Sequence, residues 1–206
     1  QAIAIDERRR MFRLNRWIEP QTFSPNPSEK TSVAHQDARQ VWFAGVHSDV
    51  GGGYPECESG QSKFPLLWMV EEARAEGVAV DQTMIDHLVL GEERAGSRHS
   101  YEPPSADARL HNSMNPAWNI LEWIPKSEKW IEWKDRAVRW GYYLPRSEPR
   151  AIPENAFIHE SVIDRKTRDH NYRPINFPKA FQIEKTREAP QTVRHGPSTD
   201  EPQPSP

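Results

Sequence analysis

The stretch "VWFAGVHSDVGGGY", residues 41–54, decides the fold that this sequence predicts. It opens with an uninterrupted apolar run, 41–46, which is typical of a strand buried on both faces of a parallel sheet. His47, Ser48, Asp49 and a run of glycines follow at once. Open α/β sheets gather their binding and catalytic side chains in loops that leave the carboxyl ends of buried strands. We therefore expect Asp49 to lie in a functional site.

The segment after the glycines predicts a helix and completes an α/β order of elements. In "FPLLWMVEEARAEG", residues 64–77, Pro65 suits the first helical turn and Gly77 suits the position just past the last one. Four apolar residues recur at helical spacing, and we expect them to form the buried face. They are Leu66, Met69, Val70 and Ala73.

Shorter elements are predicted along the rest of the chain. We expect the end of an amphipathic helix over 1–13, followed by a surface loop over 18–40. Helices are predicted over 82–90 and 116–124, and a hairpin over 129–145 that turns at Lys134-Asp135. A strand should end at 156–158, and His159 should open a short helix directly after it. From residue 184 the composition changes to Pro, Thr, Ser, Glu and Gln without apolar periodicity, which predicts disorder.

The length of 206 residues fits one domain with a tail, or part of a larger domain. Hydrophobic residues make up 35% of the chain and prolines number 19, so the apolar supply is thin for an independent core of this size. The sequence also opens inside a pattern at Gln1, without a helix-starting cap. We expect residues 1–183 to be a portion of a domain whose N-terminal half is missing, and 184–206 to be a disordered tail.

Composition excludes several classes of partner and site. The net charge of −3 supplies no basic field for nucleic acid, and the run of three arginines at 8–10 is typical of a solvated helix face. Cys57 is the single cysteine, which excludes an intramolecular disulfide and a multi-thiolate metal site. No stretch approaches 18 consecutive apolar residues, and no signal peptide is visible.

The glycines beside Asp49 favour an acid that a partner can approach. Gly51, Gly52 and Gly53 carry no side-chain bulk and tolerate positive φ, so the backbone can turn tightly around the carboxylate. In the alternative interpretation, the glycines form an ordinary turn and Asp49 only accepts hydrogen bonds from their amides. The residues alone leave both interpretations open.

A catalytic acid of this kind needs a histidine, and His159 is the candidate. It follows the apolar "AFI" and opens a predicted helix, so it occupies a strand end as Asp49 does. The alternative is a histidine that caps the helix or lies on the surface.

Two neighbours of Asp49 offer other chemistry. His47 forms a His-x-Asp pair with it that could ligate a metal, but no third ligand follows at suitable spacing, and we expect no metal and no other cofactor. Ser48 lacks the flanking glycines of a nucleophile elbow, and no GxSxG pattern occurs in residues 1–206.

Several blocks of the chain carry a resemblance to a known family. In order and character they resemble the second half of the α/β-hydrolase-like domain family that includes the phospholipase effectors of bacterial type VI secretion, and they cover nearly all of the chain before the tail. The glycine block is the most specific. The blocks are "AIAIDERRRMF" at 2–12, "VWFAGVHSDVGGGY" at 41–54, "LLWMVEEA" at 66–73, "FIHESVIDR" at 157–165 and "YRPINFP" at 172–178.

This resemblance implies the C-terminal part of an α/β-hydrolase-like parallel sheet with flanking helices, and a Ser, Asp, His triad in that chain order. Asp49 would be the acid and His159 the base, while the nucleophile motif would lie upstream and outside this chain. The implied substrate is a carboxylic ester in a lipid, and the implied location is the cytoplasm or export without a signal peptide. Without the serine, the chain alone should not hydrolyse esters at an enzyme's rate.

Two other function classes stay open beside the hydrolase. One is a non-catalytic interaction module or hydrolase remnant, and the other is a metal-dependent hydrolase that uses His47 and Asp49. An aromatic-rich stretch bears on the first of these. Its rings either pack against the local core and the missing half, or form a lid or a patch that contacts a membrane surface. They are Trp118, Trp123, Trp130, Trp133, Trp140, Tyr142 and Tyr143, and charged residues interrupt them.

Overall fold

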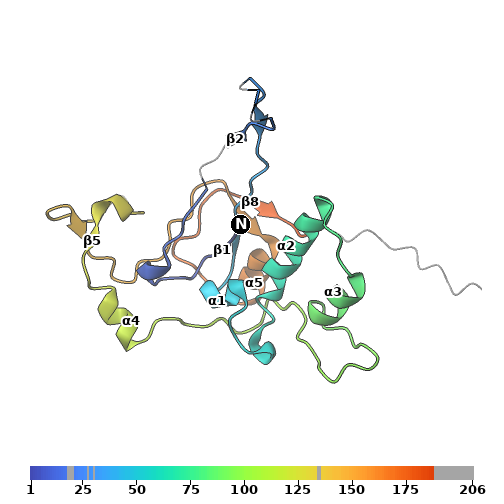
Figure 1. The fold of residues 1–206 in the computed structure, drawn as a ribbon. Helices are drawn as coiled ribbons and strands as arrows, with labels where there is room; N and C mark the ends of the chain where they lie inside the picture. The colour runs from blue at the N-terminus through green and yellow to red at the C-terminus, as the bar shows by residue number, and fades with distance from the viewer. Residues whose placement is uncertain (18–20, 27, 30, 134–135, 188–206) are drawn as a thin grey trace, which may run out of the picture.

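A four-stranded parallel sheet forms the centre of the computed structural model, which describes residues 1–17, 21–26, 28–29, 31–133 and 136–187 (Figure 1). Each strand pairs in parallel with its neighbour, and the spatial order follows the chain order. The strands are β1 (Ala2–Ala4), β4 (Val41–Phe43), β7 (Ala156–His159) and β8 (Phe181–Glu184). The predicted α/β class, a parallel sheet with flanking helices, is confirmed.

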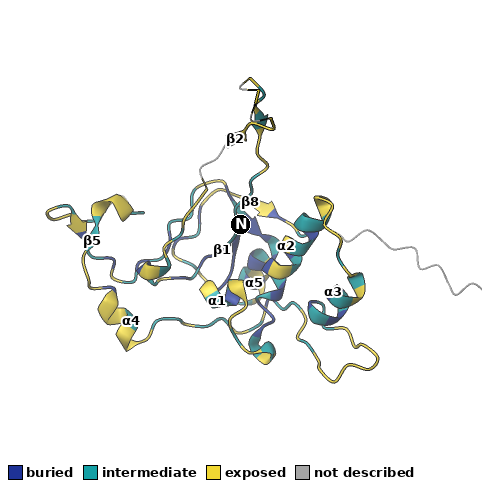
Figure 2. Ribbon diagram, viewed as in Figure 1, coloured by how far each residue is buried: buried dark blue, intermediate teal, exposed yellow. Residues whose placement is uncertain are grey.

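Both faces of the sheet are covered, as the apolar run 41–46 predicts. On one face, Trp42 and Ile158 pack with Val162 of α5 (Glu160–Arg168). On the other face, Val41 and Phe43 pack with the ring of Trp68 from α2 (Lys63–Ala75). Strands β1, β4 and β7 are therefore among the most buried parts of the molecule, whereas β8 at the edge of the sheet is largely exposed (Figure 2).

The predicted helix end over 1–13 is wrong. Residues 2–4 form β1, and a single 3-10 turn, η1 (Arg10–Phe12), follows. Ile3, Ala4 and Ile5 are all nearly fully buried, and the Ile5 amide donates to the carbonyl of Phe43 at 2.9 Å. A run of small and β-branched residues buried on consecutive positions fits a strand between two layers, because a helix would turn one of them toward solvent.

Helix α2 lies where it was predicted, and Gly77 ends it with a φ of +86°. Its buried face is different from the predicted one. Leu66 and Met69 are 46% and 47% exposed, whereas Trp68 is 2% exposed. The helix is turned so that Trp68 packs on Phe43 and donates from Nε1 to Glu184 at 3.2 Å. The other buried residues of α2 are Lys63, Pro65 and Glu71.

The helices predicted over 82–90 and 116–124 are present, but they end earlier, at Leu88 and Leu121. Asp81 caps α3 (Gln82–Leu88) by accepting from the Met84 amide, and Asn115 caps α4 (Pro116–Leu121) by accepting from the Trp118 amide. Short single turns complete the helical part of the fold, and they are α1 (His47–Gly51), η2 (Glu56–Glu58) and η3 (Glu128–Trp130). No helix in the described part of the chain has the length and apolar character to cross a bilayer.

Two small antiparallel pairs extend away from the sheet. In the predicted loop over 18–40, β2 (Thr22–Phe23) pairs with β3 (Ala34–His35). The predicted hairpin over 129–145 is only partly correct: β6 (Tyr142–Tyr143) lies within it, but β6 pairs with β5 (Lys126–Ser127), which precedes the predicted range, and η3 begins where the first strand was expected. Its predicted turn at Lys134-Asp135 lies outside the described residues.

The C-terminal boundary is later than composition indicates. Strand β8 ends at Glu184, the first residue of the predicted tail, and this carboxylate is buried between Arg39 and Trp68. The predicted tail beyond residue 187 lies outside the described residues.

Candidate functional site

Asp49 lies in the single-turn helix α1, directly after β4. The turn into this helix depends on Gly45, which has a φ of +105°. A Cβ at Gly45 would lie 2.4 Å from the Cβ of Asp49. Gly51, by contrast, has nothing within 4 Å of an added Cβ, and Gly52 closes the helix with a φ of +78°. The glycine that makes room for the acid is therefore Gly45, rather than the glycine run at 51–53 that the sequence suggested.

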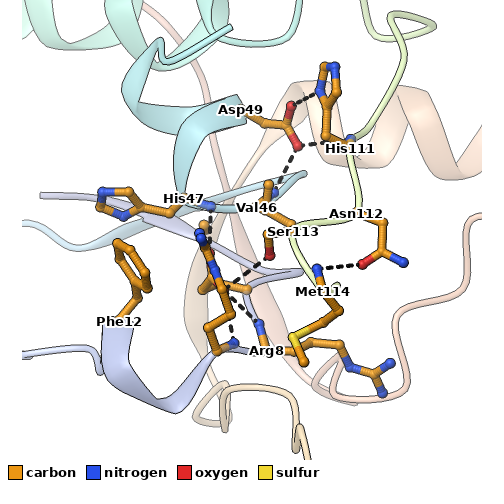
Figure 3. Close-up of polar contacts among 12 residues, drawn as sticks. Arg8, Phe12, Val46, His47, Asp49, His111, Asn112, Ser113 and Met114 are labelled. Atoms are coloured by element: carbon orange, nitrogen blue, oxygen red, sulfur yellow. Dashed lines mark hydrogen bonds and ion pairs between the residues drawn. The ribbon is translucent and has the colours of Figure 1, made fainter. Parts of the chain in front are cut away.

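Asp49 is 2% exposed, and its carboxylate accepts hydrogen bonds from several donors (Figure 3). Its Oδ2 accepts from the amide of Val46 at 2.9 Å and from the amide of His111 at 3.2 Å. Its Oδ1 lies 2.6 Å from Nδ1 of the same histidine. Asp49 is thus buried and held in one orientation, and its imidazole partner is His111.

His111 is held from three directions. Asp49 contacts Nδ1, Glu58 places its Oε2 2.8 Å from Nε2, and the ring of Tyr54 stacks on the imidazole with 3.4 Å between centroids. Burial alone would lower the pKa of His111, but its hydrogen bonds to Asp49 and Glu58 prevail and raise the pKa above 6.5. The arrangement is a carboxylate–histidine–carboxylate chain.

Glu7 connects the segment that carries Asp49 to the segment that carries His111. Its side chain is fully buried; its oxygens accept from Arg9, from the amide of His47 at 3.1 Å and from the hydroxyl of Ser113 at 3.3 Å. Burial would raise the pKa of Glu7, but the hydrogen bonds from Arg9 and His47 lower it to about 2. The end of β1 therefore ties the start of α1 to the segment of His111.

Asp6, the neighbour of Glu7, connects the end of β4 to the segment that contains Tyr172. Its Oδ2 accepts from the amide of Gly45 at 2.7 Å and from the hydroxyl of Tyr172 at 2.8 Å. Burial raises the pKa of this carboxyl more than those hydrogen bonds lower it. The "IDE" of the first block thus places two carboxylates at the same sheet edge as Asp49.

The other predicted residues of the glycine block do not join the pair. The ring of His47 lies against Phe12, with 5.1 Å between centroids, and points away from His111 (Figure 3). Ser48 packs beside Gly53, where an added Cβ would lie 2.9 Å from the serine Oγ. Within the described residues, no group of three or more His, Cys, Asp or Glu side chains is arranged to hold a metal.

His159 is at the predicted strand end, and its hydrogen bonds run to the helix that follows and to the segment after β8. It caps α5: its Nδ1 accepts from the Ser161 amide at 3.2 Å, and its Nε2 lies 3.0 Å from the hydroxyl of Thr186. The ring stacks on Phe43 and is 1% exposed. Burial lowers the pKa of His159 to about 4. These contacts match the helix-capping alternative, and the assignment of His159 as a base stays a prediction.

The partner histidine, His111, has no strand-end signal in the sequence and was not expected there. No strand precedes it, since it lies in a long connection between α3 and α4, 62 positions beyond Asp49. The signal that could have pointed to it is local: "HNSMNP" places a histidine and two small polar residues just before the Asn115 cap, where a chain is about to change direction. That signal does not identify a partner.

A cavity of about 310 Å³ opens beside the pair. Val46, His111 and Asn112 line it on the side of the acid, and Asp6, Arg8 and Arg173 are the charged residues of its lining. The space therefore has charged residues of both signs, with two arginines and one aspartate.

Comparison with known proteins relates part of this site to a family. Residues 1–72 match the family described as "T6SS, Phospholipase effector Tle1-like, catalytic domain", and this span contains Asp49, Glu7 and Glu58. The chain is 24% identical over 207 residues to the uncharacterized protein YEL023C of Saccharomyces cerevisiae; the alignment covers 69% of this chain and 30% of that protein. No solved structure matches. The N-terminal part of the chain, with the loop of Asp49, is therefore similar to a phospholipase effector catalytic domain.

Proposed function

We propose that this chain supplies the acid and base of a serine hydrolase that cleaves carboxylic esters of lipids. The observation that carries the proposal is the buried Asp49–His111 pair at 2.6 Å, at the end of a parallel strand. The acid of this pair lies in the span that matches a phospholipase effector catalytic domain.

The chemistry follows from the orientation of the imidazole. Asp49 accepts a hydrogen bond from Nδ1 of His111, which fixes the tautomer and would stabilise the imidazolium during the reaction. Nε2 is then the atom that would take the proton of a serine hydroxyl and later return it to the leaving alcohol. That serine would come from outside residues 1–206, since these contain no GxSxG motif.

His159, the base that the family resemblance implied, is the alternative within the same proposal. The burial of its ring and its two hydroxyl partners favour a capping role. His111 is the stronger candidate for the base because a buried carboxylate, that of Asp49, holds its Nδ1 and thereby orients the ring. The two assignments predict different outcomes for a pair of matched substitutions.

The substrate would be a lipid ester with an anionic head group. Arg8 and Arg173 line the cavity beside His111, and an anion bound by them would place an attached acyl ester near this histidine. A phospholipid has both groups. As an effector of the matched family, the protein would reach its target by export without a signal peptide; otherwise it would act in the cytoplasm.

The test uses the natural-length product of the gene, because the proposed nucleophile lies outside residues 1–206. We expect a fluorophosphonate probe to add once to that product, and His111→Gln to abolish both the adduct and ester hydrolysis, by at least about 10³-fold in kcat/KM. His159→Gln is the matched control and should retain most of the activity. If His159→Gln abolishes turnover while His111→Gln does not, the base is His159.

A non-catalytic interaction module is the second candidate, and one observation favours it. The stretch 116–133 and 136–147, here called the aromatic arm, leaves several large apolar side chains in solvent. Among them Trp140 is 86% exposed and Trp123 is 59% exposed. A natural-length product that takes no fluorophosphonate adduct would favour this candidate.

A further inference from the structure

The imidazole of His111 lies between two carboxylates. Asp49 Oδ1 is 2.6 Å from Nδ1, and Glu58 Oε2 is 2.8 Å from Nε2. An ionised carboxylate only accepts hydrogen bonds, and a neutral imidazole has one donor nitrogen and one acceptor nitrogen. Both contacts are satisfied together when both ring nitrogens carry a proton, so the geometry fits an imidazolium.

A histidine held in this way is not yet ready to act as a base. A base must present an unprotonated Nε2 to the nucleophile, but in the structure this nitrogen is directed at Glu58. We propose that Glu58 is a positioning residue that holds His111 in a charged resting state, and that the Glu58 side chain must withdraw before Nε2 can accept a proton. The catalytic part of this proposal rests on the function proposed above, whereas the resting state itself does not.

The two carboxylates differ in how firmly they are held. Asp49 is 1% exposed at its side chain and has two backbone donors, so it cannot leave the imidazole without unfolding α1. Glu58 is 36% exposed at its side chain and lies at the end of the single turn η2. The inner carboxylate is therefore fixed, and the outer one is free to rotate.

The turn that carries Glu58 is anchored elsewhere. Glu56 of η2 pairs with the buried Lys63 at 2.7 Å, and its Oε1 also accepts from the amide of Glu102 at 2.9 Å. A rotation of the Glu58 side chain can therefore break its bond to His111 while η2 stays in place. Arg109 is close to the second oxygen, with its Nη1 3.8 Å from Glu58 Oε1, and offers the carboxylate an exposed partner.

The charged and titratable groups around the imidazole come from three elements. Asp49 faces it from α1, Glu58 faces it from η2, and the phenol ring of Tyr54 covers its face from the segment between them. On the segment of His111 itself, Arg109 contacts Glu58 and is 75% exposed at its side chain. The two carboxylates therefore dominate the protonation of His111, and Glu58 is the one that can be removed without touching the buried acid.

The resting state can be measured on the 206-residue chain, without any substrate. Histidine ring signals from isotope-labelled protein would be followed by NMR as a function of pH. We expect Glu58→Gln to lower the pKa of His111 by about one unit, because an anionic neighbour within hydrogen-bond distance is replaced by a neutral one. Glu76→Gln, a substitution at an exposed position past α2, is the matched control and should leave the pKa of His111 unchanged. Equal values in wild type and Glu58→Gln would overturn the proposal.

A second variant distinguishes the loss of the Glu58 charge from a defect in folding. Glu58→Asp keeps the charge but shortens the side chain, so it should give a pKa of His111 between those of wild type and Glu58→Gln. His159 serves as an internal reference, since its pKa of about 4 comes from burial and should not move in any variant. A shift of His159 together with His111 would show a general change of fold and count against a specific contact.

The activity of the natural-length protein distinguishes two roles of Glu58: holding His111 in its charged form, or only supporting the loop. If Glu58 holds His111 in a resting charged state, Glu58→Gln should move the acidic limb of the kcat/KM profile to lower pH by the same amount as the NMR shift. If Glu58 only supports the loop, kcat/KM should fall equally at every pH. Should the natural-length protein prove inactive, the function proposed above fails, while the NMR comparison still decides the resting state.

Discussion

At the scale of single residues, Gly45 is the position on which the acid depends most directly. Its φ of +105° and the 2.4 Å approach of an added Cβ to Asp49 act together. We expect Gly45→Ala to lower the free energy of unfolding by about 1–3 kcal/mol, because strain and steric overlap cannot both be relieved. Gly51→Ala, where nothing lies within 4 Å, is the matched control and should be neutral or slightly stabilising. Thermal melts of the two variants, compared with wild type, decide the point; similar losses would contradict it.

Glu7 makes the free energy of unfolding depend on pH in the acidic range. Its pKa is lowered from 4.5 in the unfolded chain to about 2 in the folded one, so its stabilising effect is complete above pH 4.5 and is lost as the pH falls toward 2. The shift corresponds to roughly 3 kcal/mol at neutral pH. We expect Glu7→Gln to lower the unfolding free energy at pH 7 and to differ little from wild type near pH 2.

Urea unfolding at several pH values measures this effect. The exposed Glu29, replaced by Gln in the same way, is the control and should leave the pH dependence as it is. A constant difference between Glu7→Gln and wild type from pH 7 to pH 2 would mean that Glu7 acts through packing rather than through its charge.

At the scale of elements, the rotation of α2 is the finding to test. Trp68 is buried on Phe43, while Leu66 of the same helix is about half exposed. We expect Trp68→Ala to lower the unfolding free energy by about 3–5 kcal/mol and Leu66→Ala to change it by less than about 0.5 kcal/mol. Melting midpoints of both variants provide the measurement. A large loss of unfolding free energy in Leu66→Ala would mean that the buried face of α2 is the one that the apolar spacing predicts.

The elements that sequence could predict are those with local signals. The apolar run of β4, the caps Asp81 and Asn115, and Gly77 past α2 each specify a boundary through nearby backbone chemistry. The face of α2 could not be predicted in this way, because it depends on Glu184 and Phe43, which the sheet brings close from distant parts of the chain. Strand β1 was missed for a similar reason: three residues of strand carry no periodicity of their own, and their pairing with β4 defines them.

The candidate site shows the same division. Asp49 could be predicted because its strand, glycines and neighbours are contiguous. His111 could not, since its pairing with Asp49 is made through a connection without regular structure among its described residues, and only the folded chain brings the two together. His159 has the sequence context of a strand-end base, but the same context is the one that caps a helix, and the contacts of its ring show that role.

At the scale of the whole molecule, the aromatic arm extends from the body that holds the sheet (Figure 1), and most of its surface is exposed (Figure 2). Basic side chains accompany its rings: Arg139 lies 4.7 Å from the ring centroid of Trp140, and Arg146 lies 4.9 Å from that of Trp123. Exposed indoles beside guanidinium groups suit the interface of an anionic membrane.

Vesicle flotation tests this use of the arm. We expect the chain to bind vesicles of phosphatidylcholine that contain anionic phosphatidylglycerol, and the double substitution Trp123→Ala with Trp140→Ala to weaken that binding at least about tenfold. Trp17→Ala, at an exposed tryptophan outside the arm, is the control and should bind as wild type does. If the chain does not bind such vesicles, or if Trp17→Ala weakens binding equally, the arm is a packing surface for another part of the protein.

Cys57, between Glu56 and Glu58 on η2, is exposed and is the single thiol of the chain. A fluorophore or spin label can therefore be attached one residue from the carboxylate that holds His111, without introducing or removing any cysteine. Such a label would report in real time whether η2 moves when an ester or an anionic lipid binds.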